Sequence, residues 1–244
     1  MYQDFARIYD NLQPQTEYEK FVNYIEEIFE KFKKTPKLIL DLACGTGRLT
    51  TLLAKHGYDM IGVDISSEAL NIAADRAKAE NLNILFSQQD MTDFELYGTV
   101  DAIVCCFDSL NYITDLRDLK RCLKLCENYL NPGGLVIFDI NTQYKFEKIL
   151  ADNTFVYDFD NIFCVWENNY NKKLNEFHIT IFEKNGKKYE RFEETHLQRC
   201  FSMEEIKKIL ASVNMPVKSC FNEFSLTAPK KKSERIFFVC EKLI

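Results

Sequence analysis

An aspartate and a pair of glycines are the residues of this chain that could do chemistry together. Gly45 and Gly47 follow the apolar run 38–40, and Asp64 ends a second apolar run at 60–63. Glycine lets a backbone approach a ligand where a Cβ would clash. An aspartate at the tip of the next parallel strand can accept both hydroxyl hydrogens of a ribose. The pattern favours a nucleoside-binding crevice over an isolated tight turn.

A dinucleotide-binding protein, such as an NAD(P)-dependent oxidoreductase, would use the same residues. Its fingerprint needs a third glycine three residues after Gly47, where this chain has Thr50. A polar loop follows an expected third strand at 83–86, and its Asp90 could bind an adenine amino group while the backbone amide of Met91 faces a ring nitrogen. These features favour another nucleoside ligand and leave the oxidoreductase as the alternative.

At this point the chain resembles the class I S-adenosylmethionine-dependent methyltransferase family. Its motifs occur in the family's order: the glycine motif 41–47, the ribose acid Asp64, the adenine loop 90–91, the fourth-strand motif 101–112 and the fifth-strand motif 130–139. The opening 2–10 is similar to the N-terminal segment of small-molecule members, and 193–202 is similar to a segment of the aminosugar N,N-dimethyltransferases. The resemblance therefore covers nearly the whole chain.

The resemblance implies S-adenosyl-L-methionine as cofactor and S-adenosyl-L-homocysteine as product. The implied reaction transfers a methyl group to nitrogen or oxygen of a small polar metabolite by in-line displacement. A cofactor-binding protein without turnover is a further alternative. The implied cofactor-binding residues are Asp41, Ala43, Cys44, Gly45, Thr46, Gly47, Asp64, Ile65, Asp90, Met91, Cys106 and Phe107.

Four residues are candidates for catalysis. In the resembling small-molecule enzymes a tyrosine of the N-terminal segment lies near the transferred methyl, which implies Tyr2 and Tyr9. A histidine of the aminosugar enzymes matches Tyr112 here, and this departure indicates a different acceptor. His196 shares a strand face with two polar residues, a pattern typical of a solvated face or a pocket wall. The candidates for substrate binding are Asp108, Asn111 and Arg199.

Composition restricts the class of protein. The chain has 244 residues, 46% of them apolar, enough for one large core. A net charge of -6 predicts a small-molecule substrate and no nucleic acid. No apolar stretch approaches the ~18 residues of a membrane-spanning helix, so we expect a soluble, cytoplasmic monomer or homodimer. The nine cysteines include no CxxC pair and are expected to be buried apolar side chains, and no metal is expected.

The periodicity predicts an α/β fold with a Rossmann-like, doubly wound, seven-stranded mixed sheet. Apolar residues between 21 and 32 recur at helical spacing, and alternating strand and helix units continue to about Leu150. Three strand-like runs follow at 155–170, 173–184 and 187–201, with Asn185-Gly186 as a hairpin turn.

Two parts of the chain are therefore expected. Residues 1–150 and 202–244 would form the cofactor-binding core, and 151–201 an antiparallel lid that binds substrate. Ser202 and Glu205 have capping-box spacing and predict a helix start. Two closing strands, separated by a solvated turn at 230–232, would complete the sheet.

Overall fold

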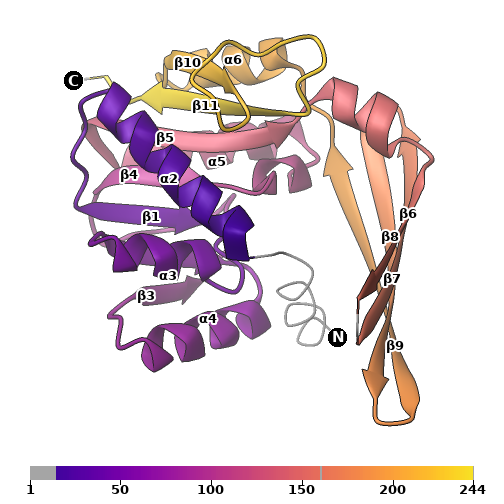
Figure 1. The fold of residues 1–244 in the computed structure, drawn as a ribbon. Helices are drawn as coiled ribbons and strands as arrows, with labels where there is room; N and C mark the ends of the chain where they lie inside the picture. The colour runs from indigo at the N-terminus through magenta and orange to yellow at the C-terminus, as the bar shows by residue number, and fades with distance from the viewer. Residues whose placement is uncertain (1–14, 160, 244) are drawn as a thin grey trace.

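The computed structural model describes residues 15–159 and 161–243 (Figure 1). Tyr2 and Tyr9 lie outside the described residues, so their predicted place near the transferred methyl stays a prediction. No helix in the described ranges is both long and apolar enough to cross a membrane.

A seven-stranded mixed sheet forms the centre of the molecule and confirms the predicted fold class (Figure 1). Its order in space is β10-β11-β5-β4-β1-β2-β3, and β11 runs antiparallel to both of its neighbours. The strands are β1 (Leu38–Leu42), β2 (Asp59–Asp64), β3 (Leu85–Gln88), β4 (Val100–Cys105), β5 (Leu130–Asn141), β10 (Val217–Asn222) and β11 (Arg235–Glu241).

Helices cover both faces of this sheet, because successive strand residues point to opposite sides. Ile39 lies in the core beneath α2 and α3, whereas Leu40 lies in the core beneath α5 and α6. Helix α4 packs beside β3 and α3. The helices are α2 (Gln15–Lys31), α3 (Arg48–Lys55), α4 (Ser67–Ala79), α5 (Leu116–Tyr129) and α6 (Met203–Ser212).

A second, four-stranded antiparallel sheet stands to one side of the first (Figure 1). The run 155–170, expected as one strand, is folded into β6 and β7, which pair with each other. The predicted turn at Asn185-Gly186 is confirmed between β8 and β9, with Gly186 at φ 63°. The strands are β6 (Thr154–Phe159), β7 (Ile162–Asn171), β8 (Leu174–Asn185) and β9 (Lys188–Arg199).

The second sheet has a small core of its own. A short π-helical segment, η2 (Lys145–Leu150), follows β5 and buries Phe146 against Phe177 and neighbouring apolar residues of β7 and β8. Strand β9 also packs against the 3₁₀ turn η1 (Ser109–Tyr112), which follows β4. The second sheet is therefore anchored to the carboxyl end of the first at two points.

Most of the local features predicted from the sequence agree with the structure, and one strand differs. The capping box is confirmed, since Ser202 Oγ accepts from Glu205 N and Glu205 Oε2 accepts from Ser202 N. The lysines at 230–232 are exposed in the turn before β11. Seven of the nine cysteines are buried and all nine are free. The third strand was expected at 83–86 but runs from Leu85 to Gln88, so Gln88 belongs to the strand and not to the loop after it.

Gly47 supplies a prediction about stability. A Cβ on Gly47 would lie 2.7 Å from Ala73 Cβ in α4, whereas a Cβ on Gly45 would meet nothing within 4 Å. Both glycines have positive φ, 71° and 54°, so alanine carries a similar backbone cost at each. We expect Gly47→Ala to lower the free energy of unfolding by about 1 to 3 kcal/mol more than Gly45→Ala, as measured by urea denaturation. Equal losses of unfolding free energy in the two variants would mean that α4 can move away from the added Cβ without destabilising the protein.

Candidate active site

The carboxyl ends of the parallel strands surround a cleft of about 320 Å³. The strand order reverses between β1 and β4, which is where open α/β sheets bind their ligands. The cleft is lined by Ala43, Val63, Asp64, Ile65, Gln89, Asp90, Met91, Thr92, Tyr112, Ile113, Thr114 and Asp118. Five predicted cofactor-binding residues and the predicted catalytic Tyr112 therefore meet in one cavity.

The glycine turn presents backbone to this cleft. Ala43, Gly45 and Gly47 all adopt positive φ, between 54° and 71°. Cys44 N donates to Val63 O at 3.0 Å, and this bond ties the turn to the end of β2. Because no described residue lies within 4 Å of the Cβ position of Gly45, a ligand can approach the backbone there.

Asp64 is held rigidly at the end of β2. Its Oδ2 accepts from Gly45 N at 2.7 Å, and its Oδ1 accepts from Ser66 N at 2.9 Å. Burial raises the pKa of Asp64, while these backbone bonds act to lower it. The carboxylate therefore lies at the rim of the cleft in a fixed orientation, as ribose recognition requires.

Asp41 lies beneath the turn instead of lining the cleft. It is 2% exposed, and its Oδ2 accepts from Thr50 Oγ1 at 2.6 Å. Thr50 occupies the place of the third dinucleotide glycine, and its hydroxyl satisfies this buried carboxyl group. Burial raises the pKa of Asp41 to about 7, with the Thr50 bond opposing and Asp64 adding to the shift.

The loop after β3 is ordered by its own polar side chains. Asp90 Oδ1 accepts from Thr92 N at 2.7 Å, and Gln89 Oε1 accepts from Glu95 N at 2.7 Å. Met91 packs against the core while lining the cleft. Gln89 and Thr92 were missed in the sequence, although both lie within two residues of Asp90.

A second cavity of about 160 Å³ lies between the strand ends and the second sheet. Tyr112 lines both cavities, so they meet at its side chain. The second cavity is lined by Glu17, Phe21, Phe107, Asp108, Tyr112, Asn141, Lys145, Leu150, Trp166, Phe177, Ile179, His196, Gln198 and Arg235.

Backbone strain is concentrated where β4 enters this second cavity. Phe107 and Asp108 have φ values of 59° and 52°, a conformation that costs non-glycine residues about 1–3 kcal/mol each. Phe107 stacks on Phe21 of α2 with ring centroids 4.0 Å apart. Asp108 N donates to Asp139 Oδ2 at 2.8 Å. These contacts hold both side chains at the wall of the cavity.

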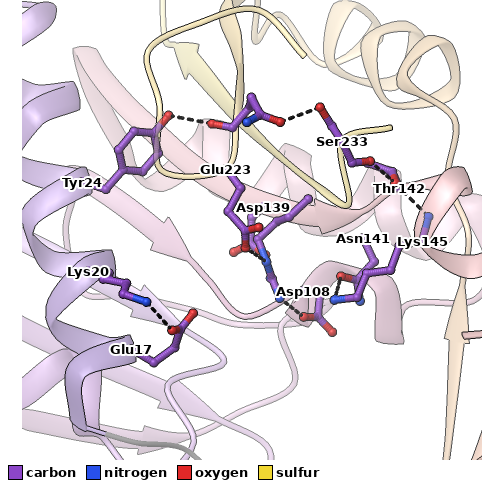
Figure 2. A network of polar contacts seen from close by, with 12 residues as sticks. Glu17, Lys20, Tyr24, Asp108, Asp139, Asn141, Thr142, Lys145, Glu223 and Ser233 are labelled. Atoms are coloured by element: carbon purple, nitrogen blue, oxygen red, sulfur yellow. Dashed lines mark hydrogen bonds and ion pairs between the residues drawn. The ribbon is translucent and has the colours of Figure 1, made fainter. Parts of the chain in front are cut away.

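Arg235 is the centre of a buried ion-pair network. Its three carboxylate partners, Asp108, Asp139 and Glu223, are labelled in Figure 2. Its guanidinium binds Asp139, lies 2.9 Å from Asp108 Oδ1 and lies 2.9 Å from Glu223 Oε1. Burial acts to lower the pKa of Arg235, but the facing acids raise it above its ordinary value. Gln198 Nε2 donates to Asp108 Oδ2 at 2.7 Å. The network therefore connects β11, β5, β9 and the end of β4.

His196 faces the second cavity. The polar face that it shares with Glu194 and Gln198 is turned inward, while Leu197 on the opposite face is 42% exposed. Its imidazole lies edge-on to the ring of Tyr112, with centroids 5.8 Å apart. Burial lowers the pKa of His196 below its ordinary value, which favours the neutral imidazole near pH 7.

Several predicted site residues line neither cavity. Asn111 is fully buried and bridges Arg199 O and Asn141 N. Arg199 donates to Thr114 O at 2.9 Å and lies over the ring of Phe201. Both residues join elements of the site without lining it. Cys44, Gly45, Thr46 and Gly47 form the turn, and buried Cys106 supports the end of β4.

Sequence reasoning also missed Lys145, Trp166 and Arg235 in the second cavity. Arg235 had a signal, because it opens the last strand of the chain and is followed there by five apolar residues. Lys145 follows the carboxyl end of β5 by four residues, the region where the other site residues gather. Trp166 lies in the inserted sheet and had no comparable signal.

Comparison with known proteins assigns the class. Residues 39–134 match the family model described as a methyltransferase domain. The chain is 34% identical to the putative methyltransferase YqeM of Bacillus subtilis strain 168, over 99% of this chain and 97% of that protein. The chain therefore belongs to a methyltransferase family.

Solved structures narrow the class. An S-adenosylmethionine-dependent methyltransferase from Clostridium acetobutylicum ATCC 824 matches with a TM-score of 0.92 at 34% identity, covering 100% of this chain and 99% of that one. The sugar N-methyltransferase KedS8 from Streptoalloteichus sp. ATCC 53650 shares the fold, with a TM-score of 0.78 at 18% identity over 93% of this chain and 88% of that one. The chain belongs to the S-adenosylmethionine-dependent methyltransferase family.

The Arg235 network gives a prediction about stability. Arg235→Met leaves Asp139 buried without its cation, so we expect the free energy of unfolding at pH 7 to fall by about 3–5 kcal/mol. The loss should shrink toward pH 4–5, because an unpaired buried carboxyl has a raised pKa and becomes neutral there. Arg117→Met, at a pair whose arginine is 91% exposed, is the control and should leave the free energy of unfolding nearly unchanged. Urea denaturation at both pH values measures the difference.

Proposed function

We propose that the protein transfers the methyl group of S-adenosylmethionine to nitrogen or oxygen of a small polar metabolite. The observation that carries this proposal is the meeting of two cavities at Tyr112, one at the strand ends and one beneath the second sheet. The first has the carboxylates that a nucleoside needs. The second is the place for the acceptor.

The residues of the first cavity fit the cofactor. Asp64 would bind the ribose, because its fixed carboxylate lies at the cleft beside the open turn. Asp90 and Met91, next along the same edge, would bind the adenine. Ile65 is 66% exposed at the cleft and offers apolar surface to a ring. The turn around Gly45 would lie beside the methionine part.

When bound, the cofactor supplies a methyl group on a positively charged sulfur, which is already a strong electrophile. The protein therefore contributes mainly by aligning the acceptor and excluding water. Phe107 and Asp108, held in strained backbone at the junction, would fix the direction from which the acceptor approaches. Asn111 and Arg199 would act on the acceptor only through the elements that they join.

His196 is proposed as the general base for an acceptor that must lose a proton. In the resembling aminosugar enzymes a histidine matches the position of Tyr112. Here the imidazole of His196 reaches the same neighbourhood from β9 and lies edge-on to Tyr112. Burial lowers the pKa of His196, so its neutral form can accept a proton near pH 7. Tyr112 would position the acceptor between the cavities.

The division into a core (1–150 and 202–244) and a substrate-binding lid (151–201) is proposed on the same basis. Trp166, Phe177 and His196 of the second sheet form one wall of the acceptor cavity, whereas the first sheet lines the cofactor cleft. A monomer or homodimer in the cytoplasm remains a prediction from the sequence.

A labelled-methyl screen tests the proposed activity. The protein is incubated with a cell extract of small metabolites and with methyl-labelled S-adenosylmethionine, and products are identified by mass spectrometry. We expect label in one or a few small molecules, with cofactor consumption dependent on the extract. Cofactor binding without any transfer would contradict the proposal and favour a binding protein.

Asp64→Ala tests the cofactor site. Loss of the carboxylate should weaken binding of S-adenosylhomocysteine by about 1.5–3 kcal/mol, the range for hydrogen bonds to charged groups. Asp59→Ala, at the exposed start of the same strand, should leave the affinity unchanged. Isothermal calorimetry measures the affinity of both variants. Equal affinity in the two would show that Asp64 does not bind the ribose.

His196→Asn tests the proposed base. Once the acceptor is known, we expect turnover to fall by about 10²–10⁴-fold while cofactor affinity stays constant. In the native protein the rate should fall as pH drops through the lowered pKa of His196, and this limb should be absent from the variant. The control is His178→Asn on the neighbouring strand, where the imidazole is exposed. Unchanged turnover in His196→Asn would refute the assignment.

A further inference from the structure

The charged groups of the second cavity are unequally satisfied. Arg235 is neutralised by three carboxylates, and Asp108 accepts from both Arg235 and Gln198. Neither residue has much capacity left for a ligand. The polar interactions available to the acceptor therefore come from the other polar side chains that line the cavity.

Lys145 is one of these groups. It opens η2, and its Nζ donates to Asn141 Oδ1 at 2.9 Å (Figure 2). Within the described ranges no carboxylate forms an ion pair with this ammonium, although an ammonium can donate three hydrogen bonds. Burial, together with the nearby Arg235, lowers the pKa of Lys145. Asp108, Glu223 and Glu234 act on this ammonium only at longer range, so an anion in the cavity could form the direct ion pair that these acids do not.

Trp166 is the second group. Its ring lies edge-on to Phe177, with centroids 5.3 Å apart, and both rings line the cavity. The indole Nε1 is buried, and no acceptor for it exists among the residues that the structure describes. A buried donor without a partner costs about 1–3 kcal/mol. A ligand oxygen at this point would remove that cost.

Lys145 and Trp166 thus offer unused donors in a lining that also holds the apolar side chains of Leu150, Phe177 and Ile179. We propose that the methyl acceptor carries a carboxylate, bound by Lys145 and Trp166, on an apolar body that contacts these side chains. The inference rests on the proposed function, because it takes this cavity as the acceptor site. One ammonium matches the single charge of a carboxylate better than the double charge of a phosphate.

Trp166 is the only tryptophan of the chain, so its fluorescence reports on this cavity alone. The probes are cyclohexanecarboxylate and its isosteric amide, cyclohexanecarboxamide, added to protein saturated with S-adenosylhomocysteine. Neither probe absorbs at the excitation wavelength of tryptophan. We expect the carboxylate to change the emission and to bind at least about tenfold tighter than the amide, as a charge-assisted pair requires.

Three lysine variants locate the effect. Lys145→Met should abolish the preference for carboxylate over amide, whereas Lys145→Arg should retain it. Lys148→Met removes an exposed lysine from the same helical segment and should behave as the native protein. Should Lys145→Met fail to fold, Trp166→Phe decides instead, since calorimetry should then show a weakened preference for the carboxylate.

Failure of this inference is distinguishable from failure of the proposed function. Equal binding of the two probes, a preference that survives Lys145→Met, or tighter binding of cyclohexyl phosphate would overturn the carboxylate assignment. The affinity for S-adenosylhomocysteine and the labelled-methyl screen test the proposed function separately, and both can succeed while the carboxylate assignment fails.

Discussion

The buried ion pairs of Arg235 are the interaction on which the rest of the site depends. Asp139 belongs to β5, Asp108 follows β4, and Arg235 begins β11, so one guanidinium joins three neighbouring parts of the sheet. It also helps hold Phe107 and Asp108 in a backbone conformation that neither residue adopts freely. Desolvating these charges is expensive, and the arrangement persists because each carboxylate has a hydrogen-bonded partner. The junction between the two cavities is rigid for this reason.

Much of the fold could be predicted because the parallel sheet leaves a strong sequence pattern. The end of β1 before the glycine turn and the end of β2 at Asp64 were assigned correctly, since apolar runs followed by glycine or polar residues mark the carboxyl edge of a sheet. The start of β3 was misplaced by two residues, because Leu85 is exposed and the strand is short. The prediction treated β6 and β7 as one strand for another reason: the sequence between them has no glycine or proline.

The second cavity could be predicted only in part, because its walls come from segments far apart in the chain. His196 was identified from its strand face, but the side of the sheet that it faces depends on how β9 packs against η1. Lys145 and Trp166 are ordinary residues in their local sequence. Their significance comes from which partners they lack, a property of the packed molecule that no spacing rule records.

The two cavities are built by different parts of the chain and share the side chain of Tyr112. Substitutions on the inner faces of β7, β8 and β9 would reshape one compartment without moving the strand ends that define the other. If the two cavities hold acceptor and cofactor as proposed, substitutions in the inserted sheet alone would suffice to change which molecule receives the methyl group.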